Sequence, residues 1–187
     1  MQFNQRKNAS VYIRDMVITS MMAAMIFVAT SFIQIKTFNG FIHLGDTMVF
    51  VAAVLLGKKK GAIAAAIGMS IFDLIYAPYW APFTFVIKGV MAYIAGSIAL
   101  RGKYEGKKLF NNILAFAVAG VWMIAAYYIS GAFVLYLINH EAGNLTIAFI
   151  MSTYDILGNI IQATAGVVLA IPLVSGIQQA LKTAKII

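Results

Sequence analysis

Long apolar runs, separated by short polar connectors, organise this chain from end to end. We predict a helix for each run: residues 15–35, 41–56, 61–76, 83–100, 110–138 and 146–175. A helix needs about 20 apolar residues to cross the hydrocarbon core of a bilayer. The runs are too long for strands and lack a period of two, so we expect no strands. The pattern predicts an all-α membrane protein with six transmembrane helices, in which residues 1–187 form a single integral membrane domain.

Lysine and arginine gather in clusters that recur about every two apolar runs. The clusters are Arg6, Lys7 and Arg14, then residues 58–60, then Arg101, Lys103, Lys107 and Lys108, and finally Lys182 and Lys185. Basic residues in short loops stay on the cytoplasmic side of a membrane. An even number of spans must therefore separate successive clusters, which predicts that both termini are cytoplasmic. The connectors 36–40, 77–82 and 139–144 would then face the outside of the cell.

Composition supports a place in the cell membrane and excludes several other classes of protein. The chain is 62% hydrophobic and 11% charged, with a mean hydropathy of +0.88. Its net charge of +8 resides at helix ends that touch anionic lipid, so we expect no nucleic-acid partner. With no cysteine and two histidines, we expect neither a metal site nor a cofactor. The first apolar run is too long for a signal peptide and lacks a cleavage site.

No motif of a soluble enzyme is present. The chain has no glycine-rich phosphate loop, no H-E-x-x-H and no G-x-S-x-G sequence. We therefore expect a protein without enzyme activity of its own, which captures a solute and depends on a partner for energy.

A few polar side chains interrupt the predicted spans in what would be the outer half of the membrane. They are Asp46, Asp73, Lys88, Asp155, Asn159 and Gln162. Each ionised side chain in a span costs about 2.5 to 3.5 kcal/mol, so it normally faces a partner or a wet cavity. Asp155, Asn159 and Gln162 share one helix face by their spacing. The outer half is also rich in aromatic residues.

We predict an outward-facing pocket for a ring-shaped polar solute, because such pockets combine apolar walls with a few convergent polar groups. The candidate residues are Asp73, Tyr76, Trp80, Phe83, Thr84, Lys88, Tyr154, Asp155, Asn159 and Gln162. Two structural alternatives stay open. Tyr79 and Trp80 could belong to an aromatic belt at the membrane interface, and Lys88 could pair with Asp73 to join two helices.

Small residues at a spacing of four predict close helix contacts in lipid. The run 61–70 has them on more than one face and is assigned to internal packing. The first helix offers Thr19 with Ala23 and Ser20 with Ala24, where a partner protein could dock as readily as a helix of the same chain.

Two segments resemble the S components of energy-coupling factor (ECF) vitamin transporters, in particular the riboflavin-type family. They run from residue 43 to 61, with His43-Leu44-Gly45-Asp46 and Leu56-Gly57-Lys58, and from Trp80 through Lys88-Gly89 to Gly96. The resemblance implies a membrane subunit that captures a water-soluble vitamin from outside. It also implies three partners: a transmembrane coupling protein of the EcfT type and two ATPase subunits of the EcfA type, which hydrolyse the ATP.

The same resemblance implies roles for two further groups of residues. The loop after the first helix, Lys36 to Ile42, would be a gate, and its candidate residues are Lys36, Phe38, Asn39, Phe41 and His43. Members of the family dock the coupling protein through two alanines four residues apart on the first helix. Here Thr19–Ala23 and Ser20–Ala24 stand in that place.

The vitamin itself is less closely defined. The modest polar set favours a small hydroxylated ring such as pyridoxine or hydroxymethylpyrimidine, with riboflavin as the alternative. A second class of hypothesis is a proton-coupled carrier that uses Asp73 and Asp155. A third is a membrane scaffold with no transported ligand.

Overall fold

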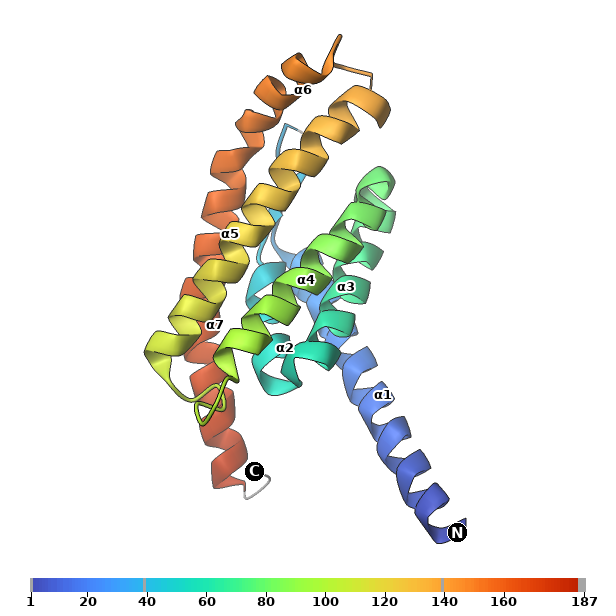
Figure 1. Cartoon of the computed structure of the whole chain (residues 1–187), viewed down its shortest axis with the longest axis vertical. Coiled ribbons are helices and arrows are strands. Elements are labelled where there is room, and N and C mark those ends of the chain that lie inside the picture. Colours follow the sequence, from blue (N-terminus) through green and yellow to red (C-terminus); the bar gives the residue numbers. More distant parts are fainter. Residues whose placement is uncertain (1, 39, 139, 185–187) are drawn as a thin grey trace.

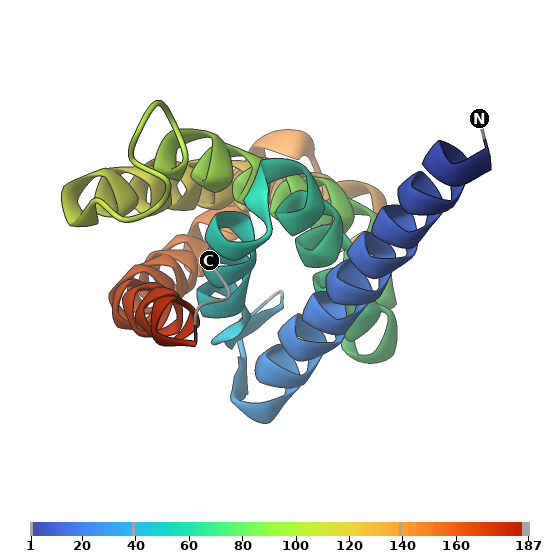
Figure 2. The same cartoon turned by 90° about the horizontal axis from the view of Figure 1, so that it is seen from below.

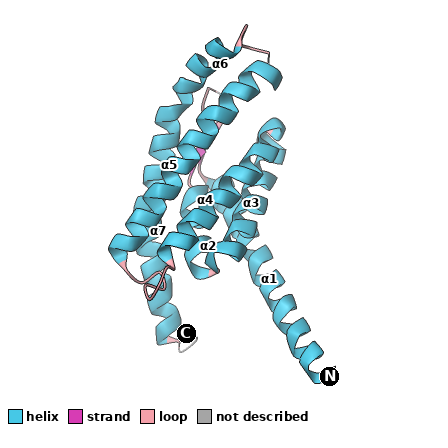
Figure 3. Ribbon diagram, viewed as in Figure 1, coloured by secondary structure: helices cyan, strands magenta, loops and turns pink. Residues whose placement is uncertain are grey.

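The computed structural model describes residues 2–38, 40–138 and 140–184, with side chains from residue 10 onward. The chain is helical almost throughout (Figures 1 and 3), which confirms the predicted all-α class. The helices are α1 (Gln2–Phe32), α2 (Gly45–Leu55), α3 (Gly57–Tyr76), α4 (Ala81–Ala99), α5 (Leu109–Phe133), α6 (Leu145–Ser152) and α7 (Ile156–Thr183).

Four helical stretches are long and apolar enough to cross a membrane. They are Ser10–Phe32, Pro78–Ala99, Leu109–Ile138 and Leu145–Thr183. The remaining two predicted spans correspond to α2, with only 11 residues, and to α3, which has three lysines near its start. Both termini lie at the same end of the molecule (Figure 1), as an even number of crossings requires. Six spans with cytoplasmic termini remain a prediction.

The connector after α1 is a small antiparallel hairpin, so the expectation of no strands is wrong here. Strand β1 (Gln34–Lys36) pairs with β2 (Phe41–His43), and Thr37 N donates to Gly40 O at 2.9 Å. The predicted helix 41–56 therefore begins only at Gly45. Strand pairing satisfies backbone groups that would otherwise lack hydrogen bonds in an apolar setting. We call β1, β2 and the connection between them the hairpin.

The last predicted helix, 146–175, is interrupted early in its course. A short 3₁₀ helix, η3 (Thr153–Asp155), separates α6 from α7, and α7 continues as a helix through Pro172. The Ser152 hydroxyl donates to Tyr128 O at 2.8 Å and the Thr153 hydroxyl to Ile150 O at 2.6 Å. Hydroxyls that bond to backbone carbonyls compete with regular helix geometry. The break between α6 and α7 therefore lies at the polar residues Ser152 and Thr153.

Short irregular helices also lie at two other turns. The 3₁₀ helix η1 (Pro78–Trp80) joins α3 to α4, and the π-helix η2 (Val134–Ile138) extends α5. Together with the hairpin and η3, these segments surround the same end of the bundle.

The centre of the bundle is α2, which contacts α1, α3, α4 and α7 (Figure 2). Glycines allow this close packing. A Cβ at Gly61 would lie 2.7 Å from Ala53 Cα, and one at Gly68 would lie 2.4 Å from Ala23 O. The small residues of α3 therefore serve internal packing, against α2 on one face and α1 on another.

Candidate functional site

A cavity lies where the hairpin meets the ends of α3 and α5, η1, and the start of α7. About 560 Å³ between its walls is free of protein atoms, and part of this space is open to solvent. Its lining combines aromatic, apolar and polar side chains. The lining residues are Thr37, Gly40, Phe41, Ile42, His43, Asp73, Ala77, Trp80, Tyr127, Asp155, Gly158, Asn159 and Gln162.

Half of the predicted site residues meet in this cavity. Asp73 comes from α3, Trp80 from η1, and Asp155, Asn159 and Gln162 from η3 and one face of α7. Helical periodicity places these last three side by side. Their contact with a ligand stays a prediction.

The other predicted residues lie around the cavity or away from it. Thr84 and Lys88 are buried in the bundle, Phe83 packs against the core, and Tyr76 and Tyr154 are exposed. The Tyr154 ring lies 5.8 Å from the ring of Phe38, and the Tyr76 ring lies 6.1 Å from that of Phe41. Tyr76 and Tyr154 thus contact the hairpin.

The predicted gate residues divide in a similar way. Phe41 and His43 line the cavity, while Lys36 and Phe38 belong to the hairpin outside the lining set. Asn39 lies outside the described residues. Thr37, Gly40 and Ile42, which lie within the predicted gate loop, also line the cavity.

Lys88 pairs with Asp46, so the predicted alternative of a pair with Asp73 is wrong. Both side chains of the Lys88–Asp46 pair are fully buried. The Lys88 ammonium also lies 5.2 Å from the centre of the Tyr127 ring, a favourable cation–π distance. The positions of Asp73 and Lys88 along their helices suggest that these two residues could pair. The central position of α2 instead brings the Asp46 carboxylate to the Lys88 ammonium. The pair holds α2 to α4.

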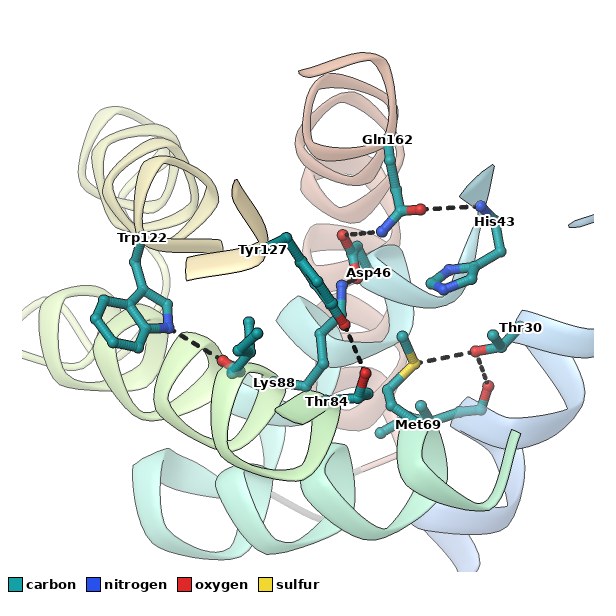
Figure 4. A network of polar contacts seen from close by, with 11 residues as sticks. Thr30, His43, Asp46, Met69, Thr84, Lys88, Trp122, Tyr127 and Gln162 are labelled. Atoms are coloured by element: carbon teal, nitrogen blue, oxygen red, sulfur yellow. Dashed lines mark hydrogen bonds and ion pairs between the residues drawn. The ribbon is translucent and has the colours of Figure 1, made fainter. Parts of the chain in front are cut away.

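Gln162 connects this ion pair to the hairpin (Figure 4). Its Nε2 donates to Asp46 Oδ2 at 2.9 Å, and its Oε1 accepts from His43 N at 3.0 Å. We call Asp46, Lys88 and Gln162 the core triad. It joins α2, α4 and α7, forms part of the cavity wall through Gln162, and reaches the backbone of β2.

A second polar chain runs into the cavity wall through Tyr127. The Tyr127 and Thr84 hydroxyl oxygens are 2.9 Å apart, so one donates to the other. The Tyr127 ring meets the Trp80 ring edge-on with a centroid distance of 5.6 Å. Tyr127 is absent from the predicted set. Its signal is a phenol in the middle of a long apolar helix, where the hydroxyl needs a hydrogen-bond partner.

The described lining residues of the cavity include acidic side chains and no basic ones apart from His43. Asp73 and Asp155 contribute carboxylates, and no lysine or arginine is in the lining set. His43 Nδ1 is buried and has no hydrogen-bond partner in the described part of the chain. Such a lining suits an uncharged aromatic ligand that carries several hydroxyl or N–H groups.

The candidate docking residues occupy two different faces of α1. Thr19 and Ala23 are buried, and Ala23 approaches Gly68 of α3. Ser20 and Ala24 are exposed. Only the second pair is open to another protein.

Comparison with known proteins gives two findings. The family model described as "ECF-type riboflavin transporter, S component" matches residues 10–179. An uncharacterized protein in the gap 3′ region of Pyrococcus woesei is 36% identical over 104 residues, which is 56% of this chain and 67% of that protein.

Proposed function

Because the chain belongs to the family of ECF-type riboflavin transporter S components, we propose that it captures riboflavin at the outer face of the membrane. The protein is a multi-pass membrane protein and a subunit of a transporter, not an enzyme. The family favours riboflavin, the alternative substrate, over pyridoxine or hydroxymethylpyrimidine. Riboflavin is neutral, combines a large aromatic ring with a hydroxylated chain, and matches the chemistry of the cavity.

The observation that carries this proposal is the arrangement of the cavity walls. One side of the cavity presents the aromatic rings of Trp80, Tyr127 and Phe41. Polar groups come from Asp155, in η3, and from Asn159, on α7. We place the tricyclic ring of riboflavin against the aromatic wall and its ribityl hydroxyls toward the polar wall. The buried Nδ1 of His43 would gain a hydrogen-bond partner from the ring.

The hairpin would act as the gate over this cavity. It contributes five residues to the lining, and its aromatic side chains contact α3 and η3. Ligand entry would require it to move away from α7. The resemblance to the family is the second support for this role.

Inward transfer would require the EcfT-type coupling protein and two EcfA-type ATPases. We place the docking surface on the exposed face of α1 that carries Ser20 and Ala24. Small residues there would let a partner helix approach closely. Thr19 and Ala23 would instead hold α1 to α3.

Titration of the purified chain with riboflavin tests the substrate. Stacking on Trp80 and Tyr127 should quench flavin fluorescence, and native mass spectrometry should detect the bound ligand. Pyridoxine and hydroxymethylpyrimidine serve as competitors. Retention of one of these small rings, with no binding of riboflavin, would overturn the proposed substrate.

Reconstitution of the chain alone in liposomes tests the mode of action. We expect ligand binding without concentrative uptake, since the chain holds no nucleotide-binding motif. Accumulation driven by a pH gradient would instead support a proton-coupled carrier. Added coupling protein and ATPases should restore ATP-driven uptake.

A further inference from the structure

One face of α7 forms the surface on which both the hairpin and α2 rest. Gly158, Gln162 and Gly166 follow one another at intervals of four residues on this face. A Cβ at Gly158 would lie 3.0 Å from Ile42 Cδ1, and one at Gly166 would lie 3.0 Å from Asp46 Cβ. The two glycines bring the hairpin and α2 close to α7. Gln162, between them, is the larger side chain that reaches both.

Gln162 makes two hydrogen bonds of opposite polarity with one amide group. Its carbonyl oxygen accepts from the backbone N–H of His43, and its NH₂ group donates to the carboxylate of Asp46. Gln162 is only 3% exposed, so water competes poorly for these groups. A carboxylate in place of the amide could accept but not donate, and it would repel Asp46.

Aromatic contacts also hold the described part of the hairpin. Phe41 and His43 meet the Phe72 ring edge-on at centroid distances of 5.8 and 5.4 Å. Such aromatic contacts tolerate small displacements. The bond from His43 N to Gln162 has a defined length and direction, so it specifies one position of β2 relative to α7.

We propose that Gln162 is a positioning residue that latches the hairpin to the Lys88–Asp46 pair and thereby sets the rate of ligand release. Gln162 lines the cavity, but on this proposal its amide is occupied by protein groups and acts through the hairpin. Opening breaks the bond to His43 N and exposes the cavity. Lys88 and Asp46 keep the latch in place, because the ion pair fixes the carboxylate that Gln162 binds. This inference rests on the proposed function, since it assumes a ligand beneath the hairpin.

Replacement of Gln162 by Met tests the latch, because Met has a similar length and no hydrogen-bonding amide. In Gln162→Met, riboflavin dissociation measured by stopped-flow fluorescence should accelerate at least tenfold, with a smaller change in association. Hydrogen–deuterium exchange of the ligand-free protein should also increase in peptides that cover the hairpin. Gln179→Met is the matched control: Gln179 is an exposed glutamine on the same helix, and its replacement should change neither quantity.

The exchange measurement separates the latch from direct ligand contact. A Gln162 that only contacts ligand would alter dissociation but leave the ligand-free hairpin as protected as in the wild type, and that result would overturn the inference. If the wild type does not bind riboflavin at all, the proposed function fails. Hydrogen exchange would still decide whether Gln162 holds the hairpin.

A disulfide across the same contact provides a test that keeps Gln162 intact. The chain has no cysteine, and a Cβ at position 158 would lie 3.3 Å from Ile42 Cγ1, so the pair Ile42→Cys and Gly158→Cys is within reach of a bond. Oxidation should slow release of bound riboflavin at least tenfold, and a reductant should restore it. Each single variant is the control. Release at the wild-type rate from the oxidised protein would show that the hairpin need not leave α7, and the latch would be rejected.

Discussion

The core triad and the polar groups of the cavity lie within one bundle, and their charges have different surroundings. In the core triad, the Lys88 ammonium and the Asp46 carboxylate neutralise each other, and Gln162 satisfies the remaining carboxylate oxygen. In the cavity, Asp73 and Asp155 lie among aromatic and amide groups with no basic residue in the described lining. The first cluster is complete without a ligand, and for the second we propose ligand binding. On this proposal, pairing with a buried cation distinguishes the structural carboxylate of Asp46 from the carboxylates of the cavity.

The largest effect should follow from loss of one partner in the complete cluster. Lys88→Met leaves the Asp46 carboxylate buried without its cation, which should destabilise the fold by about 3–5 kcal/mol. Thermal unfolding in detergent measures this change. The double variant Asp46→Leu with Lys88→Met removes both charges and should recover most of the loss. If Lys88→Met instead keeps wild-type stability and loses riboflavin affinity, Lys88 belongs functionally to the cavity.

A smaller effect should separate riboflavin from its 5′-phosphate. Each cavity carboxylate should repel each unit of phosphate charge by about 2 kcal/mol if the two charges come within roughly 8 Å at an effective dielectric constant of about 20. Riboflavin should therefore bind at least tenfold more tightly than the phosphate in fluorescence titrations. Asp155→Asn should reduce the ratio of the riboflavin affinity to the phosphate affinity. Asp15→Asn, on α1, should leave this ratio unchanged. Equal affinities of the wild type for the two ligands would contradict the proposal that the cavity carboxylates repel a phosphate.

A more modest effect should come from the chain that reaches the cavity through Tyr127. Thr84→Val keeps the shape of the side chain but removes the hydroxyl that bonds Tyr127. The loss should be about 1 kcal/mol of stability, with a decrease in riboflavin affinity of a few fold. Thr183→Val, near the exposed end of α7, is the matched control and should be neutral in both measurements.

The smallest effect on the isolated protein should come from a surface remote from both clusters. Ala24→Trp lies on the exposed face of α1, so stability and riboflavin affinity should stay near wild type. The variant should nevertheless fail to co-purify with the coupling protein and fail to support uptake in cells, because the bulky ring keeps a partner helix away. Ala23→Trp, on the buried face, should instead destabilise the protein. Normal assembly of Ala24→Trp would move the docking surface elsewhere.

Local patterns in the sequence predict those parts of the structure that depend on local geometry. Apolar runs define the helices, and the spacing of Asp155, Asn159 and Gln162 places them on one wall, because a helix repeats every 3.6 residues. The hairpin escapes this reasoning. Its strands have three residues each, too few to show a period of two.

Contacts between distant segments are harder to predict. Asp46 and Lys88 are 42 residues apart, and their pairing depends on α2 being the central helix. Nothing in the residues near Asp46 specifies that position. The role of Tyr127 could not be predicted for the same reason, because Tyr127 contacts Trp80 and Thr84, which belong to other elements.

The spacing of Gly158, Gln162 and Gly166 on α7 has a consequence for how this sequence can drift over evolutionary time. Leu157, Ile160 and Ile161 are exposed on the other side of the helix, where any apolar residue of moderate size would serve in lipid. On the inner face, a larger residue at either glycine would meet Ile42 or Asp46. Related chains that keep this hairpin should therefore vary freely along one stripe of α7 and preserve a period of four along the other, a signature that could be sought in genomes without any structure.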